Sequence, residues 1–268
     1  MLERSAKTSL ASRLRRTEEK LRRIQASRSW RWTSLLRRLW PSFRPAEPAP
    51  EPETVPPTVL ADTCSQHGEA TVLFTLLPEN APHILVDVGA HDGNYLSNSL
   101  PFIRSGWQAL LIEPNPEQFP KLAELHSGNP RAKCLQMACA EKPGQYRFFH
   151  SDDKFQSMST LSRELAAGLN IDVSRSIMVK ADTLTNLLRQ NGLPRDFSLL
   201  LIDTESYDLE VLRGLDFDQF QPRLILTEDI DNYDLPKNQA KYRLLESKGY
   251  ILEMKIKENS IWRRGAAD

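Results

Sequence analysis

The sequence predicts an α/β fold with a mainly parallel, doubly wound sheet, preceded by a helical arm. From about residue 58, short apolar runs alternate with helix-like segments, which is typical of consecutive β–α–β units. Several of these runs end in an acidic residue, at the edge where open α/β sheets bind ligands. The chain has 268 residues, of which 40% are hydrophobic and 26% charged, which is enough for a domain with a substantial core.

Residues 1–40 are predicted to form a basic amphipathic arm. Apolar residues recur there at helical spacing, and tryptophans and leucines of the stretch 30–40 can share one helix face. Residues 1–44 hold 13 Lys and Arg but three acids, a net charge of +10, whereas the rest of the chain carries −10. Such an arm fits an anionic membrane surface or a partner protein. Its leucine-rich face disfavours nucleic acid.

A proline-rich spacer follows at residues 41–57, which contain seven of the eighteen prolines. Residues 58–268 are predicted to form the folded domain. The three cysteines form no CxxC pair, and arginine or lysine interrupts every N-terminal stretch that could serve as a signal peptide or membrane span. These features favour a cytoplasmic protein, peripheral to the inner membrane face at most.

The elements of this domain are expected in a regular order. Strands are predicted at residues 84–88, 109–112, 133–137, 198–202 and 224–227, and helices at 94–104, 116–127, 206–212 and 238–248. Two further alternating stretches, 145–150 and 250–257, predict extra strands, the second closing the sheet as a late antiparallel member.

The first chemical motif is ILVDVGAHDGNY, residues 84–95. A buried strand ends near Asp87, and the chain then continues through Gly89 and Gly93 toward a helix. Backbone N–H groups there could approach a carboxylate or phosphate. Glu113 ends the next strand, where an acid can accept both hydroxyls of an adenosine ribose. The alternative is that Asp87 and Glu113 are capping or solvated acids.

The second motif is LLLIDTESYDLEVLRGL, residues 199–215. Asp203 and Glu205 follow a buried strand, and one of them could orient or deprotonate a hydroxyl nucleophile. Glu228 follows the strand of LILTED in the same way. The alternatives are that Asp203 and Glu205 cap the next helix and that Glu228 is a strand-end charge.

Taken in order, DVGAHDG, IEP, LIDTESYDLEVLRGL and LILTED resemble the motifs of the FkbM-type S-adenosylmethionine-dependent O-methyltransferases, over about residues 82–255. The resemblance implies a Rossmann-like class I methyltransferase fold and S-adenosyl-L-methionine as cofactor. It places the following residues at the cofactor: Asp87, Gly89, Ala90, His91 and Gly93 around the methionine part, Glu113 at the ribose, and Pro114 and Asn115 near the adenine.

The same resemblance places Asp203 and Glu205 at the transfer site and Glu228 on the acceptor side. It also implies a pocket-lining segment with Ser157 and Ser159, and a short strand and helix around Asp182. None of the five histidines stands at a metal-ligand spacing with an acid between, so no metal site is predicted; His91 is interpreted as a residue of the cofactor loop.

One departure from the family pattern concerns the turn after Asp203. The family usually has Glu-Gly, whereas this chain has Glu205-Ser206, and the usual second acid of the helix is Asp208. If the turn needs positive φ, losing glycine would cost on the order of 1 kcal/mol or more. Serine is a favoured N-cap, so a helix that starts there could survive.

The expected acceptor is a sugar hydroxyl in bacterial surface-polysaccharide or glycolipid synthesis. The segment SRSWRWTSLLRRL resembles one found beside glycosyltransferase and methyltransferase modules of such pathways, whose enzymes are therefore candidate partners of the arm. One alternative is an NAD-dependent oxidoreductase with Tyr233 and Lys237 spaced four apart, but Pro236 lies between them and no G-x-G-x-x-G is present. Another is a catalytically weak scaffold that the arm recruits to membranes.

Overall fold

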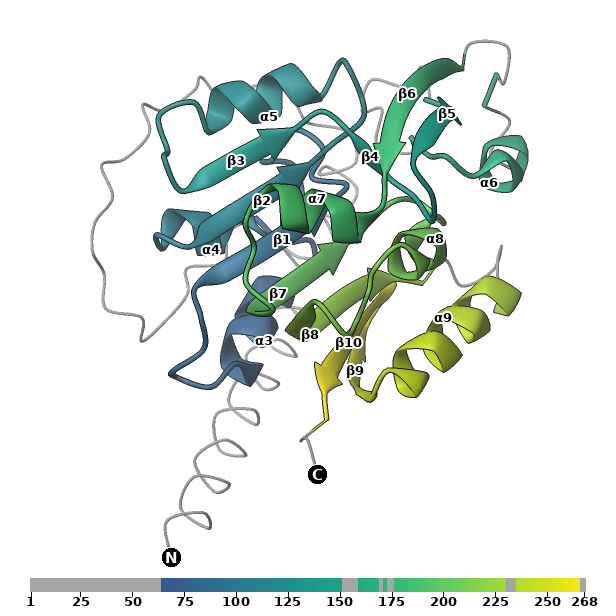
Figure 1. Ribbon diagram of the computed structural model, residues 1–268. Helices are drawn as coiled ribbons and strands as arrows, with labels where there is room; N and C mark the ends of the chain where they lie inside the picture. Colours follow the sequence, from purple (N-terminus) through teal and green to yellow (C-terminus); the bar gives the residue numbers. More distant parts are fainter. Residues whose placement is uncertain (1–63, 151–158, 169–170, 173–175, 230–234, 266–268) are drawn as a thin grey trace, which may run out of the picture.

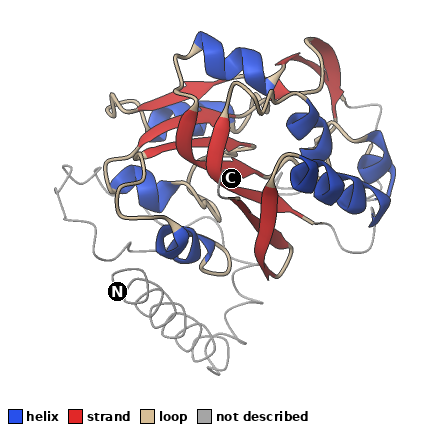
Figure 2. Cartoon of the chain, turned by 60° about the horizontal axis from the view of Figure 1, so that its bottom comes forward, coloured by secondary structure: helices blue, strands red, loops and turns tan. Residues whose placement is uncertain are grey.

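The computed structural model describes residues 64–150, 159–168, 171–172, 176–229 and 235–265. The predicted arm and spacer lie outside the described residues, as do Ser157 and Tyr233. The described part contains a seven-stranded sheet and a smaller three-stranded sheet (Figure 1). Figure 2 shows the large sheet with helices on both sides.

The large sheet has the strand order β3-β2-β1-β7-β8-β10-β9. Its strands are β1 (Ile84–Val88), β2 (Gln108–Ile112), β3 (Ala132–Leu135), β7 (Asp196–Ile202), β8 (Gln221–Glu228), β9 (Tyr250–Ile256) and β10 (Asn259–Arg264). The first five of these are parallel, and β10 is antiparallel to both of its neighbours. From β1 the strand order continues through β2 to β3 on one side and through β7 to β8 on the other. β1 and β7 therefore flank the topological switch point, where open α/β sheets bind ligands.

The predicted core strands are present, with two corrections. The predicted strand 133–137 ends at Leu135, because Ala138–Cys139 forms β4 of the second sheet. The stretch predicted to close the sheet is the edge strand β9, but it does not pair with β8. The unpredicted β10 lies between them and pairs Ile261 with Leu226 on one side and with Met254 on the other. Two consecutive arginines near its end obscure the alternation of β10.

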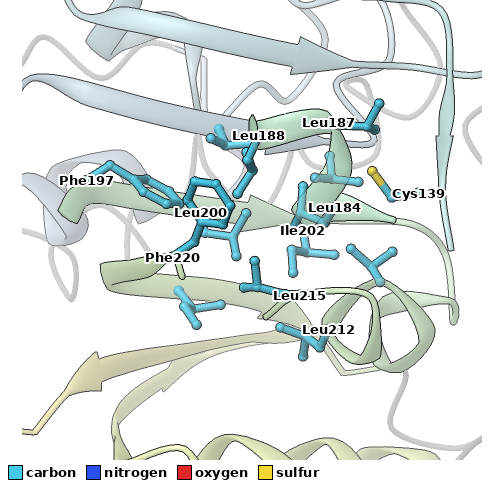
Figure 3. Close-up of a cluster of buried hydrophobic side chains, with 14 of the residues drawn as sticks. Cys139, Leu184, Leu187, Leu188, Phe197, Leu200, Ile202, Leu212, Leu215 and Phe220 are labelled. Atoms are coloured by element: carbon cyan, nitrogen blue, oxygen red, sulfur yellow. The ribbon is translucent and has the colours of Figure 1, made fainter. Parts of the chain in front are cut away.

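Side chains of the large sheet alternate between two hydrophobic clusters. Leu85 packs in one with helices α3 (Glu69–Leu76), α4 (Leu100–Arg104) and α5 (Phe119–Leu125). Val86 packs in the other with α7 (Leu184–Gln190), α8 (Asp208–Arg213) and α9 (Leu235–Ser247), as the leucines around β7 in Figure 3 illustrate. A sheet covered on both faces confirms the predicted doubly wound α/β fold. None of the described helices is both long and apolar enough to cross a bilayer.

The predicted helix 94–104 is wrong over its first six residues, because α4 begins only at Leu100. Side chains hold the preceding segment in turns: Asp92 Oδ1 accepts the N–H groups of Asn94 and Tyr95 at 2.9 and 2.8 Å, and Ser97 Oγ accepts that of Leu100 at 3.1 Å. Short polar side chains that bind nearby backbone compete with helix formation. Gly89–Gly93 therefore belongs to a loop and does not lead directly into a helix.

The second sheet has the order β4-β6-β5, with β5 at Gly144–Phe148 and β6 at Ile177–Asp182. The strand around Asp182 and the helix after it, which the family resemblance implied, are thus present as β6 and α7. Between β5 and the six-residue helix α6 (Arg163–Gly168), a bridge pairs Phe149 with Thr160. This bridge holds the described end of the serine-bearing segment beside the end of β5 in the small sheet.

Candidate functional site

The loop after β1 is held by the backbone of β2. The N–H groups of Gly89 and Ala90 donate to the carbonyl of Ile112 at 2.9 and 3.2 Å. Gly89 has φ +90°, and a Cβ there would lie 1.8 Å from the carbonyl oxygen of Asp203. At Gly93, φ is +75° and a Cβ would lie 2.6 Å from Leu122 of α5. Positive φ therefore disfavours a side chain at both glycines, and at Gly89 the Asp203 backbone also excludes one, whether or not a ligand is present.

Glu113 joins this loop to the end of β2. Its side chain is buried; Oε2 accepts the His91 N–H at 2.8 Å and Oε1 accepts the Asn115 N–H at 2.7 Å. Burial raises the pKa of Glu113 above its usual value, although both N–H groups act in the opposite direction. Each carboxylate oxygen has a second lone pair, so Glu113 can still accept one hydroxyl on each oxygen. This acceptor chemistry fits the two hydroxyls of a ribose.

The other residues predicted at the cofactor surround this hydrogen-bonded turn. Ala90 and Asn115 are buried, Pro114 is half-buried, and His91 has positive φ (+51°). The amide of Asn115 contacts Ser159 Oγ at 3.4 Å, so the described serine of the predicted pocket-lining segment lies beside the turn.

Asp87 lies near the carboxyl end of β1 and is 7% exposed. Burial raises its pKa to about 6, although a hydrogen bond from Ser99 favours the ionised form. Its negative charge also raises the pKa of Asp203 across the switch point. The charge of Asp87 at the end of β1 therefore acts on the turn after β7.

Asp203, Glu205 and Glu228 form a cluster, here called the acid cluster. One carboxylate oxygen of each lies within 4.8 Å of those of the other two. Asp203 is exposed to solvent, but desolvation by the surrounding protein and repulsion from Asp208 and Asp87 raise its pKa to about 7. Burial and the neighbouring acids raise the pKa values of Glu205 and Glu228 well above the usual range. Oε2 of Glu228 is buried and has no hydrogen-bond partner among the residues that the structure describes.

A cluster of this kind favours a cationic ligand, because a positive charge relieves repulsion among the carboxylates. The positive sulfonium of S-adenosylmethionine fits this requirement, and the hydroxyls of its ribose fit Glu113. The spacing of the three oxygens would also suit a divalent cation, so the absence of a metal stays a prediction.

The turn after Asp203 keeps a glycine-like conformation without glycine. Glu205 and Ser206 have φ +52° and +68°, and the hydroxyl of Thr160 donates to the Glu205 carbonyl at 2.6 Å. Ser206 is not the N-cap, because α8 begins at Asp208 after the N-cap Tyr207. Two consecutive residues in this region store strain on the order of 1–3 kcal/mol each. The strained turn presents Glu205 to the acid cluster.

The alternative that Asp203 and Glu205 cap the next helix does not fit this turn, because α8 has no side-chain hydrogen bond at its N-cap. The carboxylate of Asp208 itself accepts the N–H of Thr204 at 3.1 Å and its hydroxyl at 2.6 Å. The two acids of the turn are therefore not needed to hold its backbone.

Sequence reasoning missed Glu69, which begins α3 and is fully buried. Its Oε1 accepts the amide of Asn259 at 3.0 Å, and its charge contributes to the raised pKa of Asp203. Because neither α3 nor β10 was predicted, the sequence held no signal that Glu69 approaches the acid cluster.

The strand order, with one reversed strand before the last, and the acids at the switch point define a Rossmann-like class I methyltransferase fold. The family model of the methyltransferase FkbM domain matches residues 87–252, and the chain belongs to this family. Family membership confirms the predicted class of protein and, with it, S-adenosylmethionine as cofactor.

Several solved structures are similar to this chain. The FkbM methyltransferase of Methylobacillus flagellatus is 13% identical with a TM-score of 0.45, over 70% of this chain and 45% of that one. Precorrin-6y C5,15-methyltransferase of Geobacter metallireducens is 11% identical with a TM-score of 0.44, over 78% and 94%. Aeropyrum pernix fibrillarin, with natively bound S-adenosyl-L-methionine, is 10% identical with a TM-score of 0.40, over 72% of each chain. No curated protein has a matching sequence.

Proposed function

We propose that this protein methylates a sugar hydroxyl in bacterial surface-polysaccharide or glycolipid synthesis, with S-adenosylmethionine as methyl donor. The observation that carries the proposal is the acid cluster at the switch point of a methyltransferase fold. A neutral hydroxyl is a poor nucleophile, and a carboxylate within reach can orient it and accept its proton.

The cofactor would be held by the turn that Glu113 organises. Glu113 would bind the ribose hydroxyls, the loop from Asp87 to Gly93 would surround the methionine part, and Asn115 would lie near the adenine. When bound, S-adenosylmethionine supplies an electrophilic methyl group on a positively charged sulfur. The protein's contribution is then mostly to position the acceptor oxygen in line with that group.

Asp203 is the best candidate for the proton acceptor. Its pKa of about 7 is matched to neutral pH, where a base must be partly ionised and still able to take a proton. Burial and the neighbouring acids raise the pKa values of Glu205 and Glu228 well above the usual range, and these two side chains would orient the acceptor hydroxyl through hydrogen bonds. In this assignment one acid takes the proton and the others orient the acceptor.

A sugar acceptor is favoured by the sequence of the arm, which resembles segments of polysaccharide-pathway proteins. The charge of residues 1–44 suits attraction to an anionic membrane, where lipid-linked glycans are handled. Methylation of oxygen, the sugar, the polysaccharide-pathway partners and the peripheral membrane location are all parts of this proposal.

The test is transfer from radiolabelled S-adenosylmethionine to a panel of nucleotide sugars and detergent-solubilised lipid-linked glycans, by the full-length protein. We expect an alkali-stable methyl ether on at least one acceptor. Calorimetric titrations with S-adenosylmethionine, S-adenosylhomocysteine and NAD accompany the assay. Binding of NAD alone would support the oxidoreductase alternative. Cofactor binding without transfer to any member of the panel would overturn the sugar proposal and favour the scaffold.

A further inference from the structure

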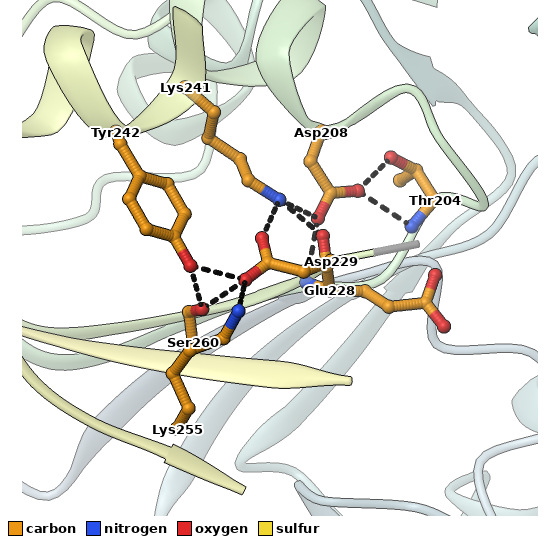
Figure 4. Close-up of polar contacts among 8 residues, drawn as sticks. All are labelled: Thr204, Asp208, Glu228, Asp229, Lys241, Tyr242, Lys255 and Ser260. Atoms are coloured by element: carbon orange, nitrogen blue, oxygen red, sulfur yellow. Dashed lines mark hydrogen bonds and ion pairs between the residues drawn. The ribbon is translucent and has the colours of Figure 1, made fainter. Parts of the chain in front are cut away.

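An ion-pair network, largely buried, lies next to the acid cluster and shares no side chain with it. Figure 4 shows it between α8, α9 and the ends of β8, β9 and β10. It contains Asp208, Asp229, Lys241, Tyr242, Lys255 and Ser260, and is here called the α9 network. Sequence reasoning noted only Asp208, as a family acid, because the partners come from distant parts of the chain.

Asp208 connects the two chain segments that carry the acid cluster. Its Oδ1 accepts the N–H and the hydroxyl of Thr204, which lies between Asp203 and Glu205. Its Oδ2 accepts the N–H of Glu228 at 2.9 Å. A single carboxylate therefore links the two segments just beyond the last ladder pair of β7 and β8, Ile202 with Thr227.

Lys241 holds this carboxylate from α9. The lysine is 2% exposed, and its Nζ lies 3.9 Å from Asp208 Oδ2 and 2.9 Å from Asp229 Oδ1. It also donates to the backbone carbonyl of Glu228. Both the N–H and the carbonyl of Glu228 are thus fixed, the first through Asp208 and the second by Lys241.

Lys255 offers a natural comparison within the same network. Its Nζ lies 3.0 Å from Asp229 Oδ2, and its side chain is 42% exposed. The described contacts of Lys255 are with Asp229 and the ring of Tyr242, on the side of the network away from Thr204. Two lysines therefore neutralise the same aspartate, but only Lys241 also reaches Asp208 and Glu228.

We propose that Lys241 is a positioning residue for methyl transfer, which holds the Asp203–Glu205 turn and Glu228 at a fixed separation through Asp208 and the Glu228 carbonyl. The proposal rests on the proposed function. A buried lysine between two acids adds little net stability over apolar packing, because its desolvation offsets much of the ion-pair attraction. Its contacts instead fix the geometry of the strand ends.

The experiment compares Lys241→Met with the matched control Lys255→Met in the full chain. Hydrogen exchange of the Thr204 and Glu228 amides reports the links to Asp208 without any acceptor. We expect exchange about tenfold faster at both amides in Lys241→Met, the result of one lost charge-assisted hydrogen bond. Lys255→Met should leave both rates unchanged.

The kinetic arm uses S-adenosylmethionine and whichever sugar acceptor of the panel gives the highest turnover. Lys241→Met should lower kcat about 10- to 100-fold, as expected for misplaced reacting groups, with acceptor KM and S-adenosylhomocysteine affinity little changed. Lys255→Met should keep the wild-type kcat. A purely structural role would lower the affinity for S-adenosylhomocysteine together with kcat.

Three results would overturn the inference: wild-type exchange at Thr204 and Glu228 in Lys241→Met, equal effects of the two lysine variants, or wild-type kcat in Lys241→Met. If Lys241→Met does not fold, the charge-balanced double variant Lys241→Met with Asp208→Asn replaces it, with the same expected outcomes. If the wild-type protein methylates no sugar, the proposed function fails, and the exchange rates alone then decide whether Lys241 holds the strand ends.

Discussion

The backbone N–H of His91 donates to Oε2 of Glu113 at 2.8 Å, across 22 residues of sequence. This bond ties the loop after β1 to the end of β2. The same carboxylate accepts the Asn115 N–H through Oε1, so Glu113 organises both segments expected to contact the cofactor. A single side chain thus organises the proposed cofactor site and has lone pairs left for a ligand.

Glu113→Ala should weaken binding of both S-adenosylmethionine and S-adenosylhomocysteine about 100-fold, because hydrogen bonds to a charged acceptor are worth about 1.5–3 kcal/mol each. Calorimetry measures both affinities. Glu117→Ala, at an exposed acid of the next turn, is the control and should bind like wild type. Equal affinities in Glu113→Ala and wild type would remove Glu113 from the cofactor site.

Asp203→Asn should lower turnover about 100- to 1000-fold while S-adenosylhomocysteine binding is kept, because the variant cannot accept the hydroxyl proton. Radiolabel transfer to the sugar acceptor measures this effect. The exposed Asp218, changed to Asn, is a control of the same chemistry. Unchanged turnover in Asp203→Asn would assign the proton to another acid.

The preference for S-adenosylmethionine over S-adenosylhomocysteine should increase as pH rises from 6 to 8. Asp203, with a pKa of about 7, is mostly protonated at the lower pH and mostly ionised at the higher one. Only the ionised form attracts the sulfonium, whereas the thioether of the product is neutral. The ratio of the two Kd values at each pH gives the preference. Asp203→Asn should flatten the dependence; an equal slope in this variant would contradict the assignment.

Gly89→Ala should destabilise the fold by about 3 kcal/mol or more, because overpacking adds to the strain of positive φ. The new Cβ would meet the Asp203 carbonyl oxygen at 1.8 Å. Urea unfolding measures the change in the free energy of unfolding. Gly192→Ala is the matched control, since its φ is +67° with no atom within 4 Å of the new Cβ, and it should cost about 1 kcal/mol. Equal effects would show that Gly89 is needed for its φ alone.

Deletion of residues 1–44 should abolish binding to anionic vesicles, since this segment carries a net charge of +10. Cosedimentation with phosphatidylglycerol vesicles, compared with neutral phosphatidylcholine vesicles, measures the binding. Activity on a soluble acceptor should be kept. Equal sedimentation of full-length and truncated proteins would remove the membrane role and leave a partner protein as the ligand of the arm.

Much of the site could be predicted because parallel strands place their carboxyl ends at one edge of the sheet. Once Asp87, Glu113 and Asp203 were assigned to the ends of β1, β2 and β7, their proximity followed from the fold class alone. Glu228 followed in the same way at the end of β8. The order of the motifs along the chain therefore predicted which acids lie at the same edge of the sheet, since each β–α unit runs in the same direction.

The reason for Gly89 could not be predicted, because the atom that excludes a side chain there is the carbonyl oxygen of Asp203, 114 positions later in the chain. The start of α4 was misplaced because side chains of Asp92 and Ser97 compete with the helix for backbone N–H groups. The sequence carries only a weak signal of such local competition, and packing around the loop decides whether the helix or the turn forms.

The sequence by itself determined the family, the parallel strands and the acids at their ends, because these depend on hydrophobic alternation and chain order. Only the tertiary structure decided that β10 enters between β8 and β9, that Glu69 meets Asn259 across 190 residues, and that Lys241 holds Asp208 next to the acid cluster. These contacts join side chains that no periodicity relates. Their partners are chosen by burial, where each charge must find an opposite charge or a hydrogen bond.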